Sequence, residues 1–343
     1  MAIGHWNNLT EAKKLTQSQL IPGIVEEDIK RNNLLDIIPV AQAMGQSIKW
    51  NREVSANEDD VSNVAIGAQL SWSASKQYDQ QEVELKRKYI QRILDSFIPD
   101  VYGTINNYEA TVLVEMKKAI IRNLGDALVY DDTTFGDGAS GEDIDGLHAW
   151  AAVQTGTELD IELSGALSLR QLRIQHDAMK YGIDFTYIPY VIARRIDAAY
   201  QEAGLAQLAT GTSGTMGSIT YGVDDHGKRV SFFDGIPFLR TDFLMEETAD
   251  TGEGSDQRAK STSGNNWSLF SVRLGDVFNG EPGLGLGFGN TEMLGQFYKI
   301  VPFDKLEDFD AQGLRLVSYV NTLLGSKLAL GRVYDITDAA VVF

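Results

Sequence analysis

The sequence predicts an α+β fold, in which strands are flanked by a few helices. Residues 104–129 and two later segments, which begin at Ser168 and Pro189, carry apolar residues at helical spacing. Residues 267–343 consist mostly of strand-like runs. The two kinds of element do not alternate along the chain in the regular way that builds a parallel βαβ sheet, which favours the α+β class.

The composition narrows the class of protein. The chain has 343 residues, of which 43% are hydrophobic, enough for one large domain or two modest ones. It has no cysteine, which excludes disulfides, thiolate metal sites and a cysteine nucleophile. The N-terminus lacks the apolar core of a signal peptide, and no run approaches about 18 apolar residues. We therefore expect a soluble protein that is made in a cytoplasm and has no membrane partner.

Residues 1–45 are predicted to form an N-terminal arm. A short helix is expected at Glu26–Leu35, bounded by Pro22-Gly23 and by Pro39. The part before Pro22 has no strong apolar period, so it needs another surface to pack on.

Residues 46–98 are predicted to form an extended two-stranded loop. Ser47–Val54 and Glu82–Ile90 alternate apolar and polar residues, whereas Ser55–Tyr78 is polar and small, with the bend Asn57-Glu58-Asp59-Asp60. About 25 residues each way could reach on the order of 80 Å. A compact domain of this size has a radius of gyration of roughly 20 Å. Because a lone hairpin is marginal in water, the loop needs a neighbour.

Three helices are expected after this loop. In the first, at 104–129, Gly125 costs about 1 kcal/mol relative to alanine, so the end is expected to fray. The second begins with a capping box formed by Ser168 and Gln171, and Gly182 is placed to end it. After a short strand, Pro189 suits the first turn of the third.

The remaining segments are predicted as loops and strands. Residues 204–230 and 246–266 are rich in Gly, Ser and Thr and are expected to be loops. Between them, Phe232–Phe243 suits a pair of strands around Asp234-Gly235. Later strands are expected at Trp267–Leu274, Gly295–Val301, Leu314–Leu323 and Val333–Ile336.

Motifs of known chemistry are missing from the sequence. The glycine run 280–289 matches neither a P-loop nor a dinucleotide fingerprint, and predicts a flexible turn between strands. No Gly-x-Ser-x-Gly elbow occurs. None of the four histidines lies in a metal-binding pair, so each is expected to be packed or at the surface: His5, His148, His176 and His226. The sequence therefore predicts no catalytic residue, no metal and no cofactor.

The order of these elements resembles that of the major capsid proteins of tailed double-stranded DNA phages, whose fold is shared with encapsulin shells. Lys13–Pro39 matches the arm of that family, residues 46–98 its extended loop, and 104–129 its spine helix. Phe233–Pro237 resembles a strand entry of its axial domain, and Phe270–Leu284 its glycine-punctuated strand and turn. The resemblance divides the chain into an arm (1–45), an extended loop (46–98), a peripheral domain with the spine helix (99–150), an axial domain (151–292) and return strands (293–343).

The resemblance implies a structural protein and not an enzyme. Hexamers and pentamers of the subunit would build an icosahedral virion shell in the cytoplasm of a bacterial host, with portal, scaffolding and decoration proteins as partners. The shell would enclose double-stranded DNA without binding it specifically. The formal net charge of −18 fits a wall that does not adhere to DNA, and fits ordinary solubility equally well. Two alternatives remain open: an encapsulin-like compartment shell, and a soluble hydrolase with an unrecognised site.

Contacts between subunits are expected from two groups of residues. The apolar residues of the extended loop are available to a neighbour, and the basic cluster that follows suits a solvated face or salt bridges to another subunit. The predicted contact residues are Ile66, Leu70, Trp72, Tyr78, Lys86, Arg87 and Lys88.

Overall fold

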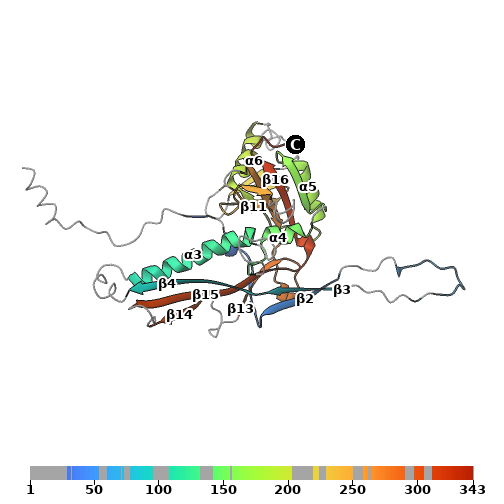
Figure 1. Cartoon of the computed structure of the whole chain (residues 1–343). Helices are drawn as coiled ribbons and strands as arrows, with labels where there is room; N and C mark the ends of the chain where they lie inside the picture. The colour runs from blue at the N-terminus through green and yellow to red at the C-terminus, as the bar shows by residue number, and fades with distance from the viewer. Residues whose placement is uncertain are drawn as a thin grey trace, which may run out of the picture.

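The computed structural model describes residues 29–31, 33–53, 60–70, 72, 78–95, 108–131, 142–154, 157–202, 219–223, 229–249, 258–261, 264–289, 297–304 and 311–342. Figure 1 shows an elongated body built on a five-stranded sheet and a second body built on a nine-stranded sheet. The short helix α4 (Leu147–Ala152) lies between them, and a two-stranded hairpin extends from the elongated body. The α+β class predicted from the sequence is confirmed.

The elongated body packs one helix on one sheet. Its strands are β1 (Val40–Ala43), β13 (Leu284–Gly289), β15 (Ala311–Leu324) and β14 (Lys299–Phe303) in that order, with β4 (Lys86–Asp95) also paired to β15. The helix α3 (Tyr108–Tyr130) lies along β4 and β15 (Figure 1). Its buried stripe of Val112, Met116 and Ile120, spaced four residues apart, packs against Leu314 and Leu316 of β15.

The helix predicted at 104–129 is therefore found at Tyr108–Tyr130, and residues 104–107 lie outside the described part. The expected fraying at Gly125 is wrong. A Cβ added to Gly125 would lie 2.5 Å from the Phe243 ring and 2.8 Å from the Asn33 amide. The glycine lets the 3-10 turn η1 (Leu34–Asp36), which Asn33 caps, approach the helix closely, and this packing offsets the propensity cost.

The second body combines a mixed sheet with two helices. Its strands follow the order β11 (Arg258–Lys260), β10 (Glu247–Ala249), β12 (Asn266–Val272), β6 (Phe185–Pro189), β9 (Ile236–Thr241), β8 (Arg229–Phe233) and β7 (Ile219–Val223). The strand β16 (Leu330–Thr337) also pairs with β12, and β5 (Asp160–Gly165) pairs with β16. The helices are α5 (Leu169–Ala178) and α6 (Tyr190–Glu202), and Leu172 and Ile192 bury their side chains in the core beside the sheet.

The hairpin pairs β2 (Ser47–Glu53) with β3 (Tyr78–Glu84) in a sheet of its own. The second strand that the sequence predicts at Glu82–Ile90 is divided in two. At Leu85 the chain leaves the hairpin, and the Leu85 N–H donates to the carbonyl of Gln46 at 2.9 Å. The following residues form β4, which pairs with β15. Alternation continues on both sides of the break, so the sequence pattern alone does not reveal the change of partner.

The glycine run 280–289 is not only a turn. Its second half is β13, a strand buried between β1 and β15. A Cβ on Gly287 would meet the Ile48 side chain at 2.8 Å, and one on Gly285 would meet the Gly275 carbonyl at 2.8 Å. The glycines permit close approach of neighbouring chain segments, so the predicted flexible turn is wrong for Leu284–Gly289.

Two predicted loops contain short strands. The strand β7 lies in 204–230, and β10 and β11 lie in 246–266. The latter are three residues each and pair with one another. Runs this short carry no period that distinguishes them from loops.

Local signals were more accurate at turns and caps. Asp234 and Gly235 have positive φ angles of 48° and 86° and join β8 to β9 as predicted. Ser168 caps α5, accepting from the Gln171 N–H. The helix ends at Ala178, before Gly182, and Pro189 closes β6 instead of opening α6. Of the helix expected at Glu26–Leu35, the described residues contain only the beginning of η1.

Candidate assembly surface

The described residues between the two hairpin strands are all exposed. Residues 61–70 and 72 belong to no helix or strand, and all of them are exposed. Ile66, Leu70 and Trp72 are 107%, 70% and 98% exposed, and Val61 is also open to solvent. Figure 1 places residues 60–70 far from both sheets. Large apolar side chains grouped in this way on a surface are typical of a site for a protein partner.

One face of the hairpin is anchored to the elongated body along the length of β2. Ile48 and Val83 are buried in a cluster with Leu323 of β15. Trp50 donates from Nε1 to the Gly325 carbonyl at 3.3 Å, and Arg52 donates to the Leu324 carbonyl at 3.0 Å. On the opposite face of the hairpin, side chains pair with each other, as in the Lys49–Glu82 ion pair at 2.9 Å. The hydrogen bond from Lys49 lowers the pKa of the exposed Glu82 carboxyl.

The predicted contact residues fall into two structural groups. Ile66, Leu70, Trp72 and Tyr78 are exposed on the hairpin and the segment it carries. The basic residues Lys86, Arg87 and Lys88 lie at the start of β4, where the pleat sends alternate side chains to opposite faces. Their assignment to contacts between subunits stays a prediction.

The three basic residues have different partners. The Lys88 ammonium lies 2.7 Å from the Asp131 carboxylate and donates to Asn123 Oδ1 at 3.2 Å, both within the same chain. The Lys86 ammonium lies 3.4 Å from the Glu84 carboxylate. Arg87 is exposed, and its guanidinium lies 5.7 Å from the centre of the Tyr89 ring. Of the three, Arg87 therefore presents its charge to the outer side of the sheet.

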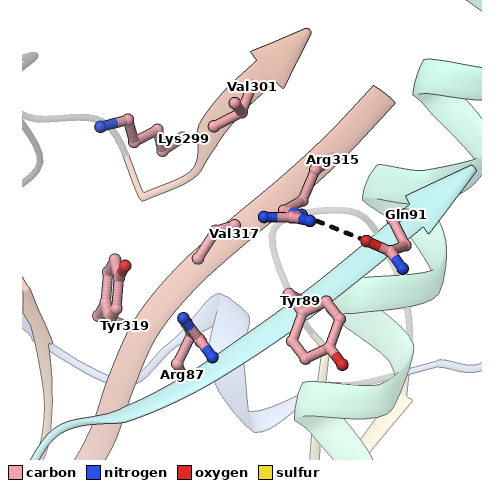
Figure 2. A pocket seen from close by; sticks show the side chains of 8 residues that line it. All are labelled: Arg87, Tyr89, Gln91, Lys299, Val301, Arg315, Val317 and Tyr319. Carbon is pink, nitrogen blue, oxygen red and sulfur yellow. Dashed lines mark hydrogen bonds between the residues drawn. The ribbon is translucent and has the colours of Figure 1, made fainter. Parts of the chain in front are cut away.

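Figure 2 shows the groove on this outer side of β4, β15 and β14, facing away from α3. The groove holds about 340 Å³, and Arg315 donates from Nε to Gln91 Oε1 at 3.3 Å across it. We call its lining residues the basic face: Arg87, Tyr89, Gln91, Lys299, Val301, Arg315, Val317 and Tyr319. Three of the eight are cationic and none is acidic, in a chain with 30 basic and 48 acidic residues.

A buried chain of polar groups crosses the second body, and sequence reasoning missed it. Arg332 of β16 donates from Nε and Nη2 to the two carboxylate oxygens of Asp160, at 2.7 and 2.8 Å. Its Nη1 lies 3.1 Å from His148 Nδ1, and His148 Nε2 lies 3.2 Å from Glu247 Oε1. All four side chains are buried. We call this set the buried polar chain.

The chemistry of arginine determines the state of His148. A guanidinium only donates, so Nδ1 of His148 must accept from Arg332, and the ring proton therefore sits on Nε2 and is donated to Glu247. Burial lowers the pKa of His148, and the charge of Arg332 acts in the same direction. The ring is thus held neutral, stacked on Tyr130 at a centroid distance of 5.2 Å.

Glu247 is an ionised carboxylate without exposure to solvent. Burial alone would raise its pKa, but the hydrogen bonds that His148, Ser268 and Tyr130 donate to the carboxylate hold the pKa below its ordinary value. The Tyr130 hydroxyl donates at 2.9 Å, which joins the end of α3 to β10. Since the groups are buried and mutually paired, the arrangement suits a structural joint between elements. It offers a substrate no access.

The histidine predictions are confirmed for the two described rings. His148 is packed in this joint, and His176 of α5 is half-buried against Phe233, with Nε2 3.2 Å from Ser271 Oγ. Burial lowers the pKa of His176 to about 4. His5 and His226 lie outside the described residues.

Neither a metal-binding cluster nor a membrane-crossing helix is found in the part of the chain that the structure describes. No group of three or more His, Cys, Asp or Glu side chains there is arranged to hold a metal ion. No helix there is both long and apolar enough to cross a membrane.

Comparison with known proteins gave matches through structure alone. No family model and no curated sequence matches the chain. The holo-SrpI encapsulin complex from Synechococcus elongatus PCC 7942 is 11% identical with a TM-score of 0.68, over 97% of each chain. The capsid of a native GTA particle is 11% identical (TM-score 0.59), and that of Microbacterium phage Oxtober96 is 10% identical (TM-score 0.58). Each covers 96% of this chain and 98% of its own.

The chain has the tailed-phage major capsid fold. The resemblance inferred from the order of elements is confirmed at the level of fold, and the fold covers nearly the whole chain. The division into five segments stays a prediction. Lys86–Asp95, which the division places in the extended loop, pairs with β15 over its whole length.

Proposed function

We propose that the chain is the major capsid subunit of a tailed phage, a structural protein that assembles into an icosahedral shell around a DNA genome. One observation carries the proposal. In a chain with a shell-protein fold, residues 60–70 and 72 expose Ile66, Leu70 and Trp72 without contact to their own core. Ordering such a segment costs roughly 1–2 kcal/mol of backbone entropy per residue, which a neighbouring subunit can offset by covering it.

The finer parts of the proposal follow from this role. Hexamers and pentamers would form the shell in the cytoplasm of a bacterial host, and portal, scaffolding and decoration proteins would complete the virion. The acidic surface repels the enclosed DNA, so the shell needs no specific contact with it. A catalytic role is not part of the proposal, and the hydrolase alternative gains no support from the buried polar chain.

The second candidate function is a compartment shell that encloses protein cargo. It is favoured by the encapsulin match, whose TM-score of 0.68 exceeds the 0.59 and 0.58 of the capsid matches quoted above. The contents separate the two candidates. Particles purified from the source organism would hold nuclease-protected DNA in the first case and one abundant co-purifying enzyme in the second.

The first test is assembly of the expressed full-length chain. Size-exclusion chromatography with light scattering, followed by electron microscopy, should show capsomers or closed shells. A protein that stays monomeric at every concentration and ionic strength would overturn both shell functions together.

A further inference from the structure

The strands β10 and β11 form a two-stranded ribbon at the edge of the nine-stranded sheet, which we call the edge ribbon. Among the described residues, its register with β12 joins one pair, Glu247 and Asn266. By contrast, β12 pairs with β16 from Asn266 to Val272. The two strands of the ribbon read Glu-Thr-Ala and Arg-Ala-Lys, so they carry no large apolar side chain. The edge ribbon therefore depends on polar side chains to stay on the second body.

Two of its charged residues make only long contacts with the body. Arg258 Nη2 lies 3.7 Å from Asp335 Oδ1, and the guanidinium lies 4.6 Å from the centre of the Tyr334 ring. The Lys260 ammonium lies 3.7 Å from the Asp126 carboxylate. Both ion pairs are longer than a hydrogen bond, so they hold the ribbon weakly.

Glu247 provides the strongest attachment. Its buried carboxylate accepts hydrogen bonds from Tyr130 of α3 at 2.9 Å, from His148 of α4 at 3.2 Å, and from Ser268 of β12. Hydrogen bonds to an ionised acceptor are roughly twice as strong as those between neutral groups. One side chain thus ties the ribbon to three elements of the body, and does so only while it is charged.

The hydrogen bonds of this joint leave no place for an added proton. His148 Nδ1 accepts from Arg332, so a proton on Nδ1 would displace the guanidinium. A proton on the Glu247 carboxyl would remove the charge that its three donors share. In agreement with this geometry, burial lowers the pKa of His148, and the donated hydrogen bonds lower the pKa of Glu247. Either proton would weaken the attachment.

The neighbouring charges do not reverse this conclusion. Burial keeps the His148 ring neutral and lowers its pKa together with the charge of Arg332, whereas Glu247 and Asp160 favour the charged ring. The strand β12 contributes only the uncharged Ser268 and Phe270. The charged and titratable groups that face His148 and Glu247 are Tyr130, Arg332 and Asp160, with Lys260 and Asp126 beside Tyr130.

We propose that the edge ribbon is a flap that acid releases, in which protons taken up by His148 and Glu247 detach β10 and β11 from the second body while the rest of the sheet stays folded. The inference goes beyond the proposed function and does not depend on it, because it concerns a single subunit.

The pH range follows from linkage. The detached groups would titrate near the ordinary pKa values, 6.5 for His148 and 4.5 for Glu247, whereas the pKa of each is lower in the attached ribbon. Detachment therefore takes up one proton below pH 6.5 and a second below pH 4.5. The stability of the attached state is complete above pH 6.5 and is lost as the pH falls. The detachment constant rises by up to about tenfold per pH unit in the first range and about a hundredfold in the second.

The first experiment uses the unaltered full-length chain. Hydrogen exchange is followed by mass spectrometry from pH 7.5 to pH 5 and corrected for the pH dependence of chemical exchange. The protection of residues 245–249 and 258–261 should fall at least tenfold, while the strand β15 keeps its protection. Protection of the ribbon that changes by less than twofold would overturn the proposal. Parallel loss in β15 would mean global unfolding and would overturn it too.

The second experiment compares two substitutions of the same kind. Glutamine can accept from Arg332 and donate to Glu247 as neutral His148 does, but it does not titrate. The variant His148→Gln should therefore flatten the pH dependence of ribbon exchange above pH 5. The matched control His176→Gln removes the other described histidine, which lies outside the joint, and should keep the wild-type dependence. An unchanged dependence in His148→Gln, or a flattened one in the control, would overturn the role of His148.

A third variant tests the attachment at neutral pH and keeps its aromatic ring. Tyr130→Phe removes one hydrogen bond to Glu247, and should lower the protection of the ribbon at pH 7.5 at least threefold without a change in β15. Tyr181→Phe, at an exposed tyrosine of the same body, is the control and should have no effect. Unchanged protection in Tyr130→Phe would show that the Glu247 carboxylate does not hold the ribbon.

Discussion

The buried polar chain and the segment of residues 60–70 and 72 both depart from the usual arrangement of a globular protein, in which charged side chains face water and large apolar ones are buried. The former places Asp160, Arg332, His148 and Glu247 out of water, whereas the latter leaves Ile66, Leu70 and Trp72 in it. The buried groups find every partner within one chain, so that region is complete when the subunit folds. The exposed apolar groups find none among the described residues. The difference separates what folding stabilises from what only association can stabilise.

The largest effect is expected when the stretch between β2 and β3 is removed. Replacing residues 54–77 with a short Gly-Ser linker should abolish stable shells and leave the unfolding midpoint of the subunit unchanged. Tyr78–Glu84 stays in the variant because it forms β3, whose Val83 belongs to the core. Thermal unfolding and particle counts by microscopy measure the two effects. Normal shells would rule out a role of this stretch in holding subunits together. A subunit that fails to fold would show that the stretch belongs to the core of its own chain, and the contrast between the two regions would fail.

The opposite result is expected for the buried polar chain. Arg332→Met leaves Asp160 buried without a counter-charge, and should destabilise the subunit by about 3–5 kcal/mol in urea unfolding. The double variant Asp160→Asn/Arg332→Met removes both charges and should recover much of that loss. If both variants were equally unstable, packing and not charge pairing would account for the stability of this region.

A smaller effect concerns pH and His176. Its pKa falls from 6.5 in the unfolded chain to about 4 in the folded protein because of burial. Between pH 6.5 and pH 4 the unfolded chain binds a proton on His176, whereas the folded protein does not. The contribution of neutral His176 to the free energy of unfolding is therefore complete at pH 7 and is lost as the pH falls toward 4. The difference is worth about 3 kcal/mol. The variant His176→Gln should show a flatter dependence of unfolding free energy on pH between 6.5 and 4. An unchanged slope would assign that dependence to other groups.

The smallest effect is that of salt on assembly. Raising the ionic strength from 0.01 to 0.1 M shortens the screening length from about 30 to about 10 Å, which weakens repulsion between subunits of charge −18. Light scattering at fixed protein concentration should therefore rise modestly over this range. A steady fall would mean that attractive ion pairs between copies outweigh the net repulsion.

Sequence reasoning succeeded where the signal is local. Asp234-Gly235 specifies a tight turn through its backbone preferences, and Ser168 caps the helix that follows it directly. The helix α3 was predicted equally well, because its apolar residues keep a helical spacing over several turns. The order of such elements was enough to identify the fold.

It failed where the deciding contact is distant in sequence. The glycines of β13 suggest a turn until Ile48, more than two hundred residues away, is known to pack against Gly287. Glu247 belongs to a polar stretch, and its burial depends on hydrogen bonds from His148, Ser268 and Tyr130, which are distant in sequence. The difference between Arg87 and Lys88 likewise depends on Asp131, beyond the far end of α3. Periodicity assigns the two side chains to opposite faces but does not say which face already holds an acid.

The join between the hairpin and β4 has a mechanical consequence. The hairpin continues through Leu85 into β4, whose ten residues from Lys86 to Asp95 all pair with β15. A force that a neighbour exerts on the hairpin therefore acts along the β4–β15 ladder, as a shear force. In this geometry the hydrogen bonds of the ladder bear the force together and do not break one after another. A shell swollen from within would pass its tension from one subunit to the next through the strongest direction of the sheet.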